Sequence, residues 1–251
     1  LRALNKYSKP YYESDKIGLI ITGVGSSKSS SDLLEIVESI NPRAICNIGV
    51  CGSTNKKWLI GSTFYVNKVI DAENGAVFYP DLLVNNIFPE AILHSFTNPQ
   101  LEPITEFSDG GFLVDMEGAT IFKTLKDLFP PQYIQVLKVV SDYLNDKYMT
   151  SKYIEMLIDE ALDGVVSFIE HYIEIIENDN FIPNSILKSI SHLSDTLRLT
   201  SSQSIKLERI VSNRYLNGDD NPFDNDIINN LVYNSKKERN ILFKRICNEY
   251  L

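Results

Sequence analysis

Strand and helix signals alternate along the first two thirds of the chain, and this order constrains the fold more than any other feature. The apolar run 17–22 predicts a buried strand, and the run 44–48 predicts a second buried strand that ends before Gly49. The other expected elements are strands at 62–70, 111–114 and 133–140 and helices between Ser30 and Asn41, at 119–129 and at 151–176. This alternation indicates an α/β domain with a mostly parallel or mixed central sheet flanked by helices.

The pattern changes near residue 178, after which only helix and loop signals remain. Capping-box patterns that begin at Thr200 and Ser235 predict two helix starts. Residues 1–177 carry 14 Lys or Arg against 24 Asp or Glu, a net charge of −10, whereas residues 178–251 carry 10 against 9, a net charge of +1. We therefore expect an α/β domain over 1–177 and an all-helical C-terminal extension over 178–251.

Composition argues against several classes of protein. A net charge of −9 argues against a general nucleic-acid binder, which needs a basic face. No apolar run approaches the roughly 20 residues of a membrane span and no signal peptide is visible, so we expect a cytoplasmic protein. The sequence begins with Leu1, from which we expect that a segment precedes it. Three cysteines, an odd and sparse count, predict free thiols rather than disulfides or a metal site.

Four loops are expected where the predicted strands end, at 22–26, 47–53, 115–118 and 141–142. Ligands of open α/β sheets bind beyond the carboxyl ends of the strands, so these loops form the candidate site. The first two loops carry glycines, whose bare backbone lets a ligand approach closely, and the last two carry carboxylates. A dinucleotide-binding motif is not indicated, because Lys28 stands where its third glycine would be.

These segments, in this order, resemble the purine nucleoside phosphorylase/nucleosidase superfamily, which includes methylthioadenosine/S-adenosylhomocysteine nucleosidase. The resemblance covers roughly residues 10–175 and rests on Thr22-Gly-Val-Gly25, Asn47-Ile-Gly-Val-Cys-Gly52, Val114-Asp-Met-Glu117 and Val140-Ser-Asp142. It implies a nucleoside phosphorylase-like fold, a small-molecule nucleoside substrate, no resident cofactor or metal, and self-association, as in a homodimer.

The resemblance also implies a role for each residue of the site. Asp142 matches the catalytic aspartate that protonates or hydrogen-bonds the purine at N7, and Ser141 supports it. Glu117 matches the glutamate that holds the ribose hydroxyls, and Met116 matches the methionine that packs on the sugar. The further substrate-binding positions that it implies are Gly25, Gly49 and Val50.

These residue types suit the cleavage of an N-glycosidic bond. Cleavage produces an oxocarbenium-like sugar and a poor leaving group, so an acid placed at the base lowers the barrier. That acid, Asp142, must hold a proton near neutral pH, which burial favours. A glutamate on the sugar diol, Glu117, positions the substrate, and its negative charge suits the cation that develops.

Three departures from the superfamily pattern bear on the nucleophile. The superfamily usually begins with a strand that supplies a phosphate loop or a water-activating glutamate, and none of the 16 residues before Ile17 shows that pattern. Asn47 stands where hexameric phosphorylases have arginine, and Val50 stands where a serine is common. Hydrolysis is therefore favoured over phosphorolysis, in which phosphate would be the co-substrate and would need a cation. A third alternative is a nucleoside-binding or interaction protein with weak catalysis.

Some of these residues also have purely structural explanations. Asp115 is expected to cap the following helix, and Glu117 shares this alternative because acids at a helix N-terminus favour its dipole. Asp142 has the alternative of capping its own loop. His94 is expected to be a partly exposed residue of a helix.

Overall fold

The structure is a computed structural model. It describes residues 1–4, 9–22, 33–37, 39–40, 42–85, 87–100, 110–145, 149–178, 182–219, 233 and 235–249.

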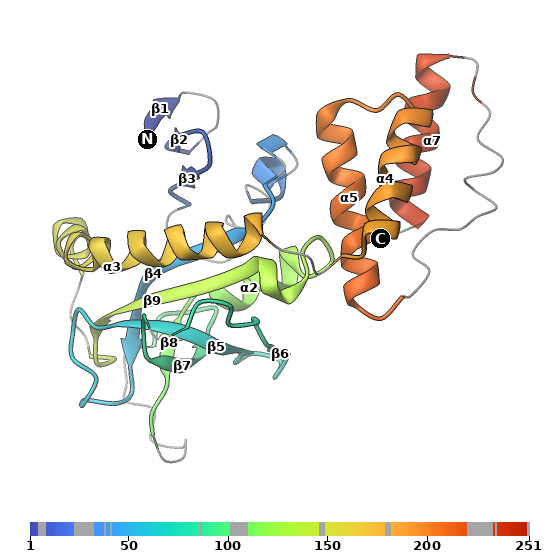
Figure 1. Cartoon of the computed structure of the whole chain (residues 1–251). Coiled ribbons are helices and arrows are strands. Elements are labelled where there is room, and N and C mark those ends of the chain that lie inside the picture. The colour runs from blue at the N-terminus through green and yellow to red at the C-terminus, as the bar shows by residue number, and fades with distance from the viewer. Residues whose placement is uncertain are drawn as a thin grey trace.

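The centre of the chain is a six-stranded mixed sheet that closes on itself (Figure 1). Its strands are β4 (Ile45–Ser53), β5 (Thr63–Asp71), β6 (Val77–Phe78), β7 (Glu90–Ser95), β8 (Leu113–Asp115) and β9 (Ile134–Asp142). Their order is β6-β5-β7-β8-β4-β9, and β5 also pairs with β9, so that five strands form a closed ring. The pairs β4–β9, β5–β7 and β7–β8 are parallel, whereas β4–β8 and β5–β9 are antiparallel. The predicted mixed sheet is therefore confirmed.

Strand β9 lies at the centre of the hydrophobic core. It pairs with β4 on one side and with β5 on the other, and all but its last residue are buried. The long helix α3 (Ser151–Glu177) packs against β9 and β4 and buries Leu157, Val165 and Phe168 along one face. Thr150 caps the start of this helix. Its side chain accepts a hydrogen bond from the backbone N–H of Tyr153, one of the first N–H groups of the helix that have no partner within it.

Helix α2 (Gly118–Leu125) connects the end of β8 to the start of β9. Its apolar side chains Ile121, Phe122 and Leu125 are buried against the sheet, as its predicted amphipathic pattern requires. The chain then passes Pro130 and the short 3₁₀ helix η1 (Pro131–Tyr133) into β9. This connection places Glu117 immediately before α2 and Asp142 at the far end of β9.

The expectation of a buried strand at 17–22 is wrong. These residues contribute β3 (Gly18–Ile20) to a small antiparallel sheet with β1 (Arg2–Leu4) and β2 (Tyr11–Glu13), apart from the central sheet (Figure 1). Leu19 is 44% exposed and Ile21 is 51% exposed. The physical reason is that β3 pairs only with β2 and is only three residues long, so its apolar side chains have no packed layer to cover them.

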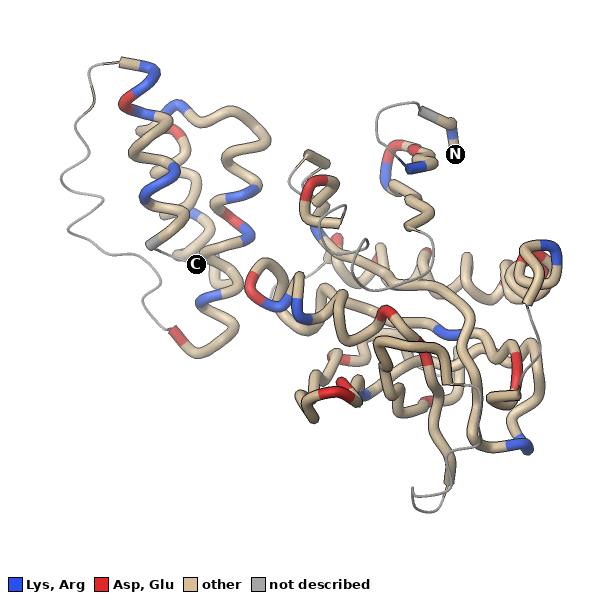
Figure 2. The backbone as a smooth tube through the Cα atoms, turned by 180° about the vertical axis from the view of Figure 1, so that it is seen from behind, with Lys and Arg blue, Asp and Glu red and all other residues tan. Residues whose placement is uncertain are grey.

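The C-terminal extension is helical, as predicted. Helices α4 (Asn184–Thr196), α5 (Ser201–Leu216) and α7 (Lys236–Glu249) pack around a core of their own (Figure 1). The capping box at Thr200 is present in full. Lys and Arg are interspersed with Asp and Glu on these helices, in keeping with the near-neutral charge of this segment (Figure 2). No helix in the described ranges is both long enough and apolar enough to cross a membrane.

Helix α5 also holds the extension against the α/β domain. The side-chain amide of Asn213 donates a hydrogen bond to the carbonyl oxygen of Asp127 over 3.0 Å. The guanidinium of Arg209 lies 4.9 Å from the centre of the Phe129 ring, within the range of a cation–π interaction. Both contacts fall on the turn that connects α2 to β9, so the extension rests on the segment between the two predicted site acids.

Candidate active site

The register of the central strands brings two of the predicted strand-end loops, 115–118 and 141–142, to either side of β4. The expectation of a loop at 47–53 is wrong, because β4 continues to Ser53 through its pairing with β9 and β8. Residues 23–26 of the remaining predicted loop lie outside the described residues. Gly52 of β4 pairs with Val114 of β8 on one side and with Asp142 of β9 on the other. Asp142 and the loop from Val114 to Glu117 therefore flank β4, with backbones roughly 10 Å apart across two strand spacings. A Cβ atom built on Gly52 would lie 3.3 Å from Asp142 Oδ1, so the carboxylate reaches over this glycine.

Both carboxylate oxygens of Asp142 accept hydrogen bonds. Oδ1 accepts from the backbone N–H of Leu144 over 2.8 Å, which is the loop cap that the structural alternative predicted. Oδ2 lies 2.8 Å from the hydroxyl of Ser141, which is buried and lies 3.0 Å from the carbonyl oxygen of Cys51. The hydroxyl has one proton to donate. It can donate a hydrogen bond to an ionised Asp142, or donate one to the carbonyl oxygen of Cys51 and accept a hydrogen bond from a neutral Asp142. The same geometry therefore accommodates both protonation states.

A buried ion pair that the sequence did not predict lies beside these residues. Lys138 Nζ is 2.9 Å from Asp115 Oδ2, and both side chains are almost fully buried. The same Oδ2 accepts the backbone N–H of Gly118 over 2.9 Å, so Asp115 also satisfies the first free donor of α2, as expected. Burial by itself would lower the pKa of Lys138, but the neighbouring Asp115 and, to a lesser extent, Glu117 raise it above its usual value.

Charged groups on both sides of β4 affect the pKa of the Cys51 thiol in this cluster. Burial raises the pKa of Cys51, the charge of Lys138 opposes this, and the carboxylates of Asp115 and Asp142 raise it further. Glu117 acts electrostatically on Lys138 and, unlike Asp115, its side chain makes no capping hydrogen bond to α2. The helix-cap explanation thus fits Asp115, while the Glu117 carboxylate belongs to the cluster around Lys138.

The remaining predicted site residues are Met116, Gly49, Val50 and Gly25. Met116 is half-buried between Asp115 and Glu117. Gly49 pairs with Lys138, and a Cβ atom built on it would lie 3.4 Å from Lys138 Nζ, so the glycine makes room for the lysine. Val50, the next residue of β4, pairs with Val139 and is half-buried. Gly25 lies outside the described residues.

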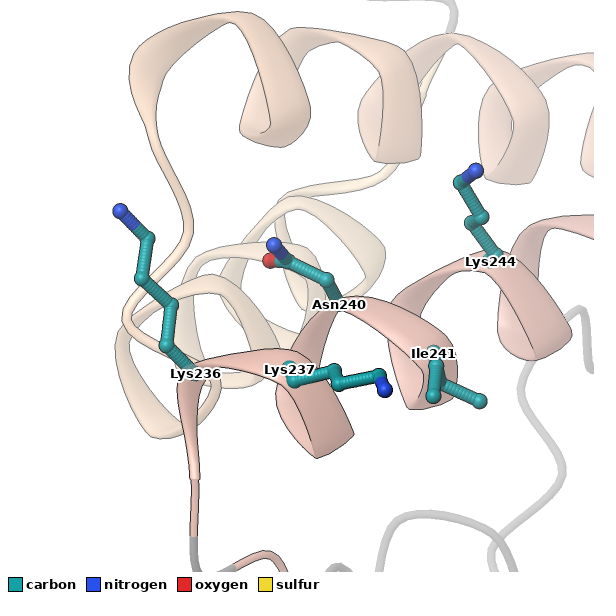
Figure 3. Close-up of a pocket in the computed structure, with 5 residues that line it drawn as sticks. All are labelled: Lys236, Lys237, Asn240, Ile241 and Lys244. Carbon is teal, nitrogen blue, oxygen red and sulfur yellow. The ribbon is translucent and has the colours of Figure 1, made fainter.

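The space over Gly52, between the two flanking strands, contains an apolar side chain. Leu144 is 3% exposed and packs with Phe112 and Val114. Its Cδ2 lies where a side chain at Gly52 would be, so only glycine fits at that position of β4. A shallow pocket occurs elsewhere, on α7 of the helical extension, where Lys236, Lys237, Asn240, Ile241 and Lys244 line it (Figure 3).

The expectation for His94 is wrong. His94 lies in strand β7, pairs with Val114 of β8, and is buried with its ring centre 4.2 Å from that of Phe112. The apolar run 91–93 in this strand is short, and such a run fits a helix turn or a buried strand equally well when only its periodicity is considered.

We expect His94 to make the folded protein less stable in mild acid. Burial, and secondarily the charge of Lys68, lower the pKa of His94 from its usual 6.5. Below pH 6.5 the unfolded chain therefore binds a proton that the folded chain excludes, so the free energy of unfolding falls until the folded-state pKa is reached. Urea unfolding at pH 7.5 and pH 5.5 should show a smaller loss for His94→Gln than for the unaltered protein; equal losses would contradict this.

Comparisons with known proteins agree with the fold. No protein-family profile matches the sequence, and no curated protein matches it. Futalosine hydrolase of Helicobacter pylori strain 26695 matches with a TM-score of 0.54 and 13% identity, over 69% of this chain and 87% of that chain. The 5′-methylthioadenosine/S-adenosyl homocysteine nucleosidase of H. pylori matches with a TM-score of 0.54 and 13% identity, over 69% and 88%. The Campylobacter jejuni nucleosidase matches with a TM-score of 0.51 and 17% identity, over 69% and 89%. The chain therefore has the fold of the nucleoside phosphorylase/nucleosidase superfamily, as its sequence motifs implied.

Proposed function

We propose that this chain hydrolyses the N-glycosidic bond of a purine nucleoside, with Asp142 as the acid at the base and Glu117 as the ribose anchor. The observation that carries the proposal is the register at Gly52, which sets these acids on either side of one strand. The base and the sugar of a nucleoside are adjacent rings, so acids that approach from the two strands flanking β4 can contact one each. The structures with the same fold include a hydrolase and a nucleosidase bound to 5′-methylthioadenosine.

The surroundings of Asp142 suit an acid that gives up and regains a proton. When Asp142 is neutral, the Ser141 hydroxyl accepts a hydrogen bond from the carboxyl O–H and donates one to the carbonyl oxygen of Cys51. When Asp142 becomes ionised after protonating the leaving purine, the backbone N–H of Leu144 stabilises the new charge at Oδ1. Because both partners are already in place, the change requires little rearrangement, which is the condition for efficient acid catalysis.

Water suits this cluster better than phosphate as the nucleophile. Lys138 lies beside Gly49 and is a cation that the sequence motifs did not reveal. Its charge is matched by Asp115 at 2.9 Å and is accompanied by the negative charge of Glu117. A dianionic phosphate would therefore meet a net negative cluster, whereas a neutral water molecule would not be repelled.

Base release from a panel of nucleosides tests the proposal. The full chain should be incubated with methylthioadenosine, S-adenosylhomocysteine, futalosine, adenosine and inosine, with and without phosphate, and the free base should be measured by chromatography. We expect release of the base at the same rate in both conditions, with a free sugar as the second product. Release that requires phosphate would favour phosphorolysis, and saturable binding without release would favour a nucleoside-binding protein.

A further inference from the structure

Leu144 has a backbone conformation that its sequence does not explain. Its φ angle is +55°, in the left-handed region, which is strained for a leucine because its Cβ crowds the following carbonyl oxygen. Among the described residues other than glycine, only Leu144 and Arg198 have positive φ angles. Arg198 follows Leu197, the C-cap residue of α4, and this conformation commonly ends a helix at that position. Leu144 follows a strand, so the surrounding contacts must impose its conformation.

The contacts of its side chain provide that constraint. Leu144 is 3% exposed and lies over Gly52, packed against Phe112 and Val114. Gly52 pairs with Asp142 on one side of β4 and, on the other side, with Val114, which leads to Glu117. The leucine side chain therefore fills the space that a ligand reaching both acids would have to enter.

The backbone of the same residue restrains the acid itself. The N–H of Leu144 donates to Asp142 Oδ1 over 2.8 Å. A change of the Leu144 φ angle from the left-handed region to an ordinary value would move the side chain off Gly52. The N–H lies in the peptide plane shared with Tyr143 and would stay on Oδ1. Opening of the space would thus relieve strain while Asp142 keeps its hydrogen-bond partner.

We propose, on the basis of the proposed function, that the Leu144 side chain is a hydrophobic plug that closes the base subsite until a purine base displaces it. The vacated space is bordered by the Phe112 ring, the Val114 side chain and the bare backbone of Gly52. A flat, apolar-faced ring with a nitrogen acceptor at its edge fits these surroundings, with the acceptor facing Asp142. The plug lowers the apparent affinity for the base, because only the fraction of molecules with the plug withdrawn can bind.

Calorimetric titration with free adenine tests the plug without requiring turnover. Leu144→Gly removes the side chain and the strain, and Leu144→Ala removes only the side chain. We expect both variants to bind adenine about tenfold more tightly than the unaltered chain. This factor corresponds to a Leu144 side chain that closes the subsite in about nine in ten molecules of the unaltered chain. Leu137→Ala, at a fully buried position of β9 that pairs with Ile48 and Tyr65, is the matched core truncation and should leave adenine affinity unchanged.

The outcomes separate this inference from the proposed function. Affinity for adenine that is unchanged or weaker in both Leu144 variants would overturn the plug, whether or not the chain releases bases from nucleosides. Tighter adenine binding in a chain that shows no base release would support the plug and reject the hydrolase. If the chain does turn over, the Leu144 variants should show a lower KM, whereas a purely structural role of Leu144 would lower stability without lowering KM.

Discussion

Asp142→Asn is expected to lower the rate of base release by about 10²–10⁴-fold, the usual contribution of a general acid. The amide has no proton of suitable acidity to give to the leaving purine. It should preserve the local geometry, because its oxygen can accept the Leu144 N–H and its NH₂ group can donate to Ser141 while Ser141 donates to Cys51. The rate constant of base release under saturating nucleoside is the measurement that checks this.

A matched control separates lost chemistry from lost charge. Asp163→Asn makes the same change on an exposed position of α3, outside the site, and should leave the rate within about twofold of the unaltered chain. The urea midpoint of Asp142→Asn should stay close to that of the control. An Asp142→Asn variant that folds normally and still releases base at the original rate would show that Asp142 is only the cap of its loop.

The places of Asp142 and Glu117 relative to their own strands were predictable because they depend on strand ends. A buried apolar run that ends in a polar residue places that residue at the end of a strand, although the direction of the strand in the sheet stays open. Asp142 and Glu117 are both of this kind, since one ends β9 and the other follows β8 by two residues. What the sequence does not reveal is which strands are neighbours, and hence that Gly52 stands between these two residues.

Other features escaped prediction because they depend on long-range packing. The run 17–22 is apolar enough for a central strand, but no local pattern states which sheet a strand will join, and here it joins β2. The Leu144 conformation also has no local signal, because its cause is a contact with Gly52 on another strand. The ion pair between Lys138 and Asp115 depends on the placement of β8 and β9 on either side of β4. The lysine inside the apolar run of β9 was the one signal available, since such a residue requires a buried partner.

Lys138→Met is expected to lower the free energy of unfolding by about 3–5 kcal/mol, the largest effect on stability that we predict. Methionine fills nearly the same volume, so the loss arises from the Asp115 carboxylate, which would remain buried without its cation. Lys126→Met is the matched control, because it breaks a pair with Asp127 in which both side chains are more than half exposed, and it should cost less than about 1 kcal/mol. Urea unfolding at pH 7 measures both losses.

A second substitution identifies the cause of that loss. Asp115→Asn added to Lys138→Met removes the unpaired charge, while the asparagine oxygen can still accept the backbone N–H of Gly118. The double variant should therefore be more stable than Lys138→Met alone, which is opposite to the additive loss expected of two unrelated core changes. Additive losses would mean that the lysine stabilises the fold through packing rather than charge. Since Asp115 leads directly into Met116 and Glu117, a double variant with restored stability should also recover nucleoside binding, because the retained hydrogen bond from the Gly118 N–H holds the loop of the proposed ribose anchor in place.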